Sequence, residues 1–95
     1  MSAYLVAIRH STRDPKELET YLRLAPSTLQ GQPVTALAAY GHHEVLEGPE
    51  IEGMVIIEFP TIDAAKAWYD SPRYREVREH RFKGAEYSMM IVQGV

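Results

Sequence analysis

The sequence predicts one small α+β domain whose elements follow the order strand, helix, strand, strand, helix, strand. The chain has 95 residues, the size of a single domain, so residues 1–95 are treated as one unit. Short runs of strand-forming residues alternate with segments that carry helix-start signals and a helical spacing of apolar residues. With 45% hydrophobic and 24% charged residues, the composition is that of a globular domain rather than a disordered chain.

The chain begins with a strand and a helix. Ala3 to Ile8 is a short apolar run rich in strand formers. Asp14 can cap a following helix, Pro15 suits its first position, and Glu17 stands where a capping box needs an acid. The apolar residues of this helix recur at helical spacing, and Pro26 ends or bends it. These apolar residues are Leu18, Tyr21, Leu22 and Ala25.

The middle of the chain predicts two further strands. Val34 to Tyr40 reads as the second strand, and His42 to Leu46 is an alternative continuation of it after a bulge. Glu47 to Glu50 has the residues of a turn. Met54 to Phe59 is the clearest strand of the chain.

Two helices and a last strand follow. Thr61 is the predicted cap of the next helix, and Asp63 lies in its first turn, where the helix dipole favours an acid. Ser71 and Pro72 are a second cap signal, so a new helix is expected to start there and to close at Gly84. Glu86 to Gln93 is the last predicted strand.

This order is that of the ferredoxin-like split β-α-β fold, with a four-stranded antiparallel sheet and the helices on one of its faces. If the other face met water, each strand would alternate apolar and polar residues. The first, third and last strands are instead apolar at consecutive positions, so both faces need a cover. We expect a second copy of the same sheet there, in a homodimer. Helices that wrap further, or a different protein on that face, are the alternatives.

Several residue groups also resemble a known family. The stretch Glu58-Phe59-Pro60, Ala64-Ala65, Trp68-Tyr69, Ser71-Pro72 and Tyr74 is similar to the signature of the domain-of-unknown-function family 1330. Leu46-Glu47-Gly48, Asp14-Pro15, Tyr21 and Ala25-Pro26 fit the same pattern. The resemblance implies a dimeric α/β barrel, in which two ferredoxin-like sheets pack face to face, and it implies no particular function.

The chain departs from that family at one place. Family members often carry a basic residue and two glycines late in the second strand, where this chain has Ala39, Tyr40 and Gly41. The departure argues against any anionic ligand that the missing basic residue would bind.

Composition excludes several classes of function. The formal net charge is −3, and acidic residues interrupt the densest basic stretch, so no nucleic-acid partner is expected. The chain has no cysteine, which excludes disulfides, thiolate metal sites and a cysteine nucleophile. No segment is a candidate targeting signal or membrane span, so we expect a cytoplasmic protein without a membrane partner. No phosphate loop or dinucleotide fingerprint is present, and no cofactor is expected.

Glu58 is the most informative candidate for chemistry. It ends an apolar strand beside Phe59, so if Phe59 points to the helices, Glu58 points into the space between two sheets. A carboxylate in such a place could act as a general base or acid. The alternative is structural, with Glu58 paired to Arg9, Arg81 or another cation.

The histidines predict no metal site. His42 and His43 are adjacent, so in an extended segment they point to opposite faces and cannot easily share one ion. His80 lies on a charged helix, at no ligand spacing from the others. His10, at the end of the first strand, is either a proton carrier near neutral pH or an exposed loop residue.

An aromatic cluster surrounds the predicted helix break. Trp68, Tyr69 and Tyr74 are expected mainly in the core, with some rings at the mouth of a pocket. Arg81 falls on the same helical side as Tyr74, which calls for a carboxylate partner, and Glu47 and Glu58 are the candidates.

Three functions remain open. The first is a small-molecule pocket supporting acid–base chemistry on a small hydrophobic acid or ring compound, with Glu58 as the base and His10 or Tyr40 assisting. Its ligand-binding residues would be those of the aromatic cluster together with Arg81 and Glu47. The second is a binding or regulatory module without chemistry, because no complete catalytic constellation is present. The third is a purely structural dimerisation module.

Overall fold

A computed structural model describes residues 1–95. Four strands form its sheet: β1 (Ala3–Thr12), β2 (Thr35–Ala39), β3 (Gly53–Phe59) and β4 (Ala85–Gln93). The helices are α1 (Pro15–Leu24), α2 (Ile62–Tyr69) and α3 (Pro72–Gly84), and a short 3₁₀ helix, η1 (Ala25–Leu29), continues from α1. The predicted order of elements is confirmed, including the helix break before Pro72.

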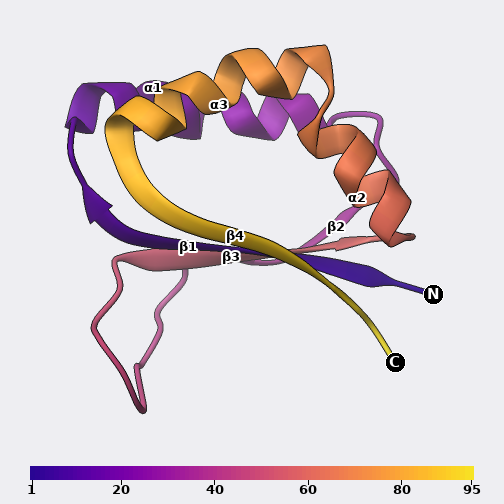
Figure 1. Cartoon of the computed structure of the whole chain (residues 1–95), viewed down its shortest axis with the longest axis horizontal. Coiled ribbons are helices and arrows are strands. Elements are labelled where there is room, and N and C mark those ends of the chain that lie inside the picture. Colours follow the sequence, from indigo (N-terminus) through magenta and orange to yellow (C-terminus); the bar gives the residue numbers. More distant parts are fainter.

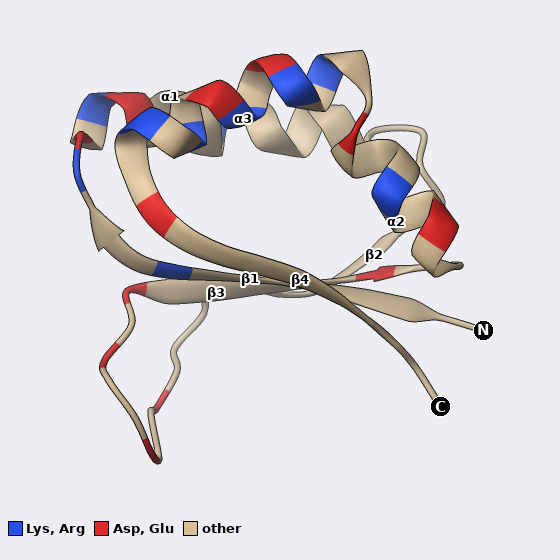
Figure 2. Cartoon of the chain, viewed as in Figure 1, with Lys and Arg blue, Asp and Glu red and all other residues tan.

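The sheet is antiparallel throughout, with strand order β2-β3-β1-β4. All helices lie on one of its faces, and α1 and α3 run side by side above it (Figure 1). This arrangement confirms the predicted α+β, ferredoxin-like fold. The helices and the long β2–β3 loop carry most of the charged residues, whereas the sheet is nearly free of them (Figure 2). No helix of the chain has the length and apolar character that crossing a membrane requires.

Capping residues start the helices as predicted. Asp14 Oδ1 accepts hydrogen bonds from the backbone nitrogens of Lys16 and Glu17, and Thr61 Oγ1 accepts one from Ala64. The reciprocal half of the capping box is absent. The carboxylate of Glu17 instead contacts His80 Nδ1 at 2.6 Å, because α3 packs directly against α1.

The alternative extension of the second strand is wrong. β2 ends at Ala39, and His42 to Leu46 lies in a loop that projects from the face opposite the helices (Figure 1). Tyr40 has φ 58°, a left-handed conformation that turns the chain out of the sheet. The backbone bond from Tyr40 N to Met54 O, at 2.9 Å, is the last between the two strands.

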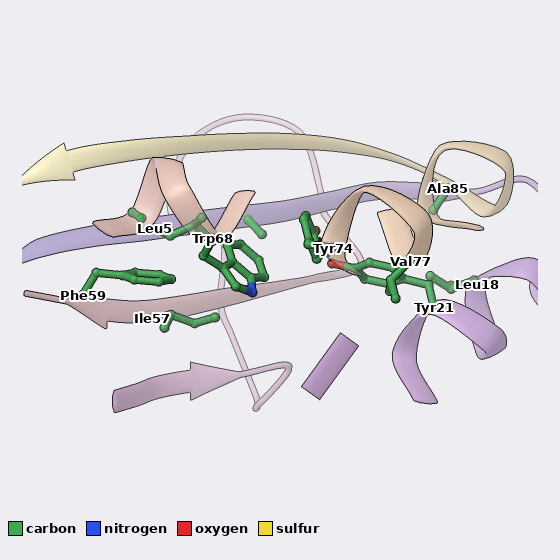
Figure 3. Packing of buried hydrophobic residues seen from close by; sticks show 11 residues of the cluster. Leu5, Leu18, Tyr21, Ile57, Phe59, Trp68, Tyr74, Val77 and Ala85 are labelled. Carbon is green, nitrogen blue, oxygen red and sulfur yellow. Dashed lines mark hydrogen bonds between the residues drawn. The ribbon is translucent and has the colours of Figure 1, made fainter. Parts of the chain in front are cut away.

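The core fills the layer between the sheet and the helices (Figure 3). Its largest fully buried side chains are Tyr74, Phe59 and Leu5. Trp68 packs on Phe59 at a ring-centroid distance of 5.7 Å and on Tyr74 at 4.0 Å. Strand residues that alternate with the core residues form the opposite face, which we call the open face. They include Tyr4, Val6, Ile8, Met54, Ile56, Met90 and Val92.

Gly84 sets the distance between α1 and α3. A Cβ atom there would lie 2.5 Å from the backbone nitrogen of Leu18 and 2.9 Å from its Cα, which no side chain can do without moving a helix. Its carbonyl oxygen also accepts hydrogen bonds from the backbone nitrogens of Arg13 and Asp14. The helix closes at Gly84 as predicted, and the missing side chain of this glycine allows the close approach.

Candidate ligand-binding cavity

A cavity of about 290 Å³ lies between the helix-facing side of the sheet and the helices above it. Strands β1, β2, β3 and β4 contribute its floor, and α1, η1 and the indole of Trp68 enclose it. Of its 14 lining residues, 13 are hydrophobic, so water inside it would find few hydrogen-bond partners. They are Leu5, Ala7, Tyr21, Leu22, Ala25, Pro26, Leu29, Ala36, Ala39, Tyr40, Val55, Ile57, Trp68 and Met89.

The cavity opens at the edge strand. Ala36 and Ala39 of β2 line it and are exposed, as are Leu22 and Pro26 on the opposite wall. The methyl side chains of the alanines leave room that larger strand residues would fill. Ala36 and Ala39 thus form the cavity mouth.

Hydrogen bonding fixes the Trp68 indole as a wall. Its Nε1 donates to Thr28 Oγ1 at 3.0 Å, and Thr28 Oγ1 donates to the carbonyl oxygen of Ala25 at 2.7 Å. These bonds join α2 to η1, whose residues Ala25 and Leu29 also line the cavity. The position of the 3₁₀ helix over the cavity is therefore tied to the indole.

Tyr40 forms the polar end of the cavity. Its ring passes so close to Gly53 that a Cβ there would lie 2.8 Å from Tyr40 Cδ1, and the Arg9 guanidinium lies over the ring at 5.0 Å. Its hydroxyl lies 2.6 Å from the Tyr87 hydroxyl. Tyr40 occupies a position where the family resemblance leads one to expect glycine. Its left-handed backbone conformation costs free energy in any residue with a side chain.

A second tyrosine pair lies beside the first. The hydroxyls of Tyr21 and Tyr74 are 2.7 Å apart, and the Tyr21 ring meets the Tyr87 ring edge-on at 6.2 Å. Burial is the main cause that raises the pKa of Tyr21, of Tyr40 and of Tyr74 above the ordinary tyrosine value. The hydroxyls of Tyr21 and Tyr40, two residues that line the cavity, therefore stay protonated at neutral pH.

Arg81 lies in the same layer and lacks the carboxylate partner that the sequence suggested. Glu47 is in the exposed β2–β3 loop and Glu58 is on the open face, so the sheet separates both from Arg81. The side chain of Arg81 is only 5% exposed, and its guanidinium carbon lies 4.9 Å from the Phe82 ring centroid and 5.2 Å from that of Tyr87.

The three residues expected to share acid–base chemistry are not together. Glu58 is half-buried on the open face, in register with Tyr4 and Thr35. It has no ion pair within the chain, and Arg9 pairs with Glu52 at 3.1 Å instead. His10 is exposed, with Nε2 at 2.8 Å from Ser88 Oγ. Tyr40 alone borders the cavity.

The remaining predicted binding residues divide between the core and the surface. Trp68 lines the cavity, Tyr74 lies behind it through its bond to Tyr21, and the Tyr69 ring packs under the Arg78 guanidinium at 4.4 Å. His42 is paired with its neighbour Glu44 at 3.6 Å on the exposed loop. His43 Nε2 lies 3.1 Å from the carbonyl oxygen of Ile51, and no cluster of three metal-ligating side chains occurs.

The sequence did not single out Tyr21, Thr28, Ala36 or Tyr87 as site residues. Tyr21 appeared as one apolar position of a helix face, and nothing in the helical spacing distinguishes a core tyrosine from one that borders a cavity. The pairing of hydroxyls separated by 53 and 47 residues is visible only in three dimensions.

Comparison with known proteins identifies the family of the chain. Residues 2–95 match the family described as Domain of unknown function (DUF1330). The chain belongs to this family. Among curated proteins, none matches it.

Solved structures share the fold at low identity. A protein of unknown function from Rhodopseudomonas palustris is 16% identical with a TM-score of 0.76, and the match covers 99% of this chain and 82% of that one. A dimeric ferredoxin-like protein of unknown function from Thermobifida fusca is 15% identical, with a TM-score of 0.69 over 99% and 92% of the two chains. SnoaB, a cofactor-independent oxygenase from Streptomyces nogalater, is 11% identical, with a TM-score of 0.63 over 99% and 93%.

Proposed function

We propose that the chain binds a small, mainly apolar organic molecule in the cavity between its sheet and α1. The observation that carries this proposal is a cavity of about 290 Å³, open at the edge strand, with an almost wholly hydrophobic lining. Binding sites for small molecules are typically concave and apolar, with a few polar groups that fix the orientation of the ligand. Tyr21 and Tyr40 supply such groups as protonated hydroxyls.

Binding without acid–base chemistry is the function that the cavity supports best. Its tyrosines have raised pKa values, so they donate hydrogen bonds and do not act as bases at neutral pH. One neighbour in fold is a cofactor-independent oxygenase, and at 11% identity the similarity extends to the fold alone.

Acid–base chemistry by Glu58 is the second candidate. In this proposal the carboxylate works on the open face without His10, which lies six positions along β1 from Tyr4, the register partner of Glu58. What favours it is that Glu58 is a half-buried carboxylate with no cation partner on an otherwise apolar surface. Such a site would be complete only once a second sheet covers that face.

We also propose that the open face is the interface of a homodimer. Met90 is 45% exposed and Val92 54% exposed on this face in the single chain. An apolar surface of this kind favours association over exposure to water. Two neighbours in fold are described as dimeric ferredoxin-like proteins, which agrees with this arrangement.

A thermal-shift screen of small apolar compounds tests the binding proposal. Compounds that occupy the cavity should raise the melting temperature of the wild type. Ala39→Leu would fill the mouth and should remove that rise, whereas Ala67→Leu adds the same bulk on the exposed side of α2 and should preserve it. Equal rises in the two variants would contradict binding in this cavity.

A further inference from the structure

We propose that the ligand of this cavity is a small apolar organic acid bound as its anion, with the negative charge at the tyrosine end and Arg81 as its countercharge. This inference rests on the proposed function, because it names the class of molecule that the same cavity takes. The starting observation is the buried positive charge of Arg81, which no anionic side chain of the protein balances.

Arg81 is a buried cation without an anion. Its side chain is 5% exposed, and its Nε is buried without a hydrogen-bond partner. None of the ion pairs in the chain includes it. A guanidinium keeps its proton in proteins, so the group cannot escape the cost of burial by becoming neutral. An unpaired buried charge is strongly unfavourable, and an anion at this place would offset that cost.

The groups around Arg81 have hydrogens to donate and few acceptors. In each tyrosine pair one hydroxyl donates to the other, which leaves one O–H hydrogen per pair free. Arg81 is hydrogen-bonded to the Tyr74 hydroxyl, and no carboxylate of the chain forms an ion pair with it. The site is therefore rich in donors, which is the property that a carboxylate or phenolate ligand requires.

Arg81 is linked to the cavity through these tyrosines. Its guanidinium carbon lies 5.9 Å from the centre of the Tyr21 ring, and Tyr21 borders the cavity. On its other side it lies 5.2 Å from the ring of Tyr87, whose hydroxyl bonds that of Tyr40, also a cavity residue. A negative group at this end would receive the free hydroxyl hydrogens and lie near the positive charge.

Neither a partner subunit nor the other nearby cation accounts for this arrangement. The open face, where a second chain would pack, lies across the sheet from α3, the helix that carries Arg81 (Figure 1). Arg9 lies over the Tyr40 ring, but Glu52 already balances its charge at 3.1 Å. The unbalanced charge is thus that of Arg81, which does not itself line the cavity but lies beside Tyr21, which does.

Calorimetric titration with two matched compounds tests the inference. Para-tert-butylbenzoate and para-tert-butylbenzamide have nearly the same shape and differ in charge. We expect the wild type to bind the benzoate at least about tenfold more tightly, a difference of about 1.4 kcal/mol. Arg81→Met keeps the length of the side chain without its charge and should remove the preference while the amide still binds. Arg75→Met, which removes an exposed cation from the same helix, should leave the preference in place.

The outcomes distinguish a failure of the proposed anion preference from a failure of the proposed ligand binding in the cavity. Equal affinity of the wild type for both compounds would overturn the role of Arg81 and leave cavity binding intact. This comparison needs no variant, so it decides the matter even if Arg81→Met does not fold. A preference that survives in Arg81→Met, or is lost in Arg75→Met, would also overturn it. If neither compound binds, or if Ala39→Leu binds both as the wild type does, binding in this cavity itself is contradicted.

Discussion

The indole nitrogen of Trp68 donates a hydrogen bond of 3.0 Å to the hydroxyl of Thr28, which joins α2 to η1 across 40 residues of sequence. Both groups are buried. The bond holds the 3₁₀ helix over the cavity and fixes the ring that closes it. The stability of the fold and the shape of the cavity therefore both depend on this hydrogen bond.

Thr28→Val should destabilise the chain and change the environment of the indole. Valine has the shape of threonine but leaves the buried Trp68 N–H without an acceptor, which costs about 1–3 kcal/mol. Chemical denaturation followed by circular dichroism measures this change in unfolding free energy. Thr28→Ser keeps the acceptor and should lose less; a larger loss in the serine variant would contradict the assigned role of the bond.

Gly84→Ala should be among the more damaging single-methyl additions in the chain. The added Cβ meets backbone atoms of Leu18, which cannot rotate away, so α1 and α3 must separate. Overpacking of this kind costs about 1–3 kcal/mol or more. Gly41→Ala is the control, because nothing lies within 4 Å of a Cβ there. Similar melting temperatures for the two variants would contradict the close approach of the helices.

Stability should fall at alkaline pH because of the buried tyrosines. Burial raises the folded-state pKa of Tyr21 and of Tyr40 above the unfolded value. Their contribution is fully present below the unfolded pKa of about 10 and is lost as the pH rises past it. The unfolding free energy, measured in urea at a series of pH values, should decline above that point. Tyr21→Phe should flatten the decline; a wild-type profile that is level there would contradict the burial of these hydroxyls.

Val6→Glu should separate the proposed homodimer. Val6 lies on the open face, in register with Ile56 and Met90, so a glutamate there would bury a charge against an apolar partner. Light scattering coupled to size exclusion should report a dimer for the wild type and a monomer for this variant. Ala67→Glu introduces the same charge on the exposed side of α2 and should remain dimeric. A monomeric wild type would contradict the proposed interface.

The architecture was predictable because its signals are local. The caps at Asp14, Thr61 and Ser71 each depend on residues within one helical turn, and the structure shows them as predicted. Apolar strands on both faces likewise follow from consecutive residues. The left-handed turn at Tyr40 was not predictable, since a tyrosine rarely adopts that conformation and nothing in the adjacent sequence requires it.

The site was less predictable because distant residues form it. Trp68 was a reasonable candidate, but the cavity also needs the small side chains of Ala36 and Ala39 on an edge strand and a 3₁₀ helix above them. A carboxylate partner was expected for Arg81 because buried charged side chains in proteins are usually paired with an opposite charge. The sheet prevents that pairing by placing Glu58 on its other face.

The most direct test of ligand binding uses the intrinsic fluorescence of Trp68, which is the single tryptophan of the chain and part of the cavity wall. Titration with para-tert-butylbenzamide should give a saturable change in wild-type emission. The same titration should give no change in Ala39→Leu, where the mouth is filled, and the wild-type response in Ala67→Leu. A saturable change of equal size and midpoint in Ala39→Leu, or none in the wild type, would contradict binding in the cavity.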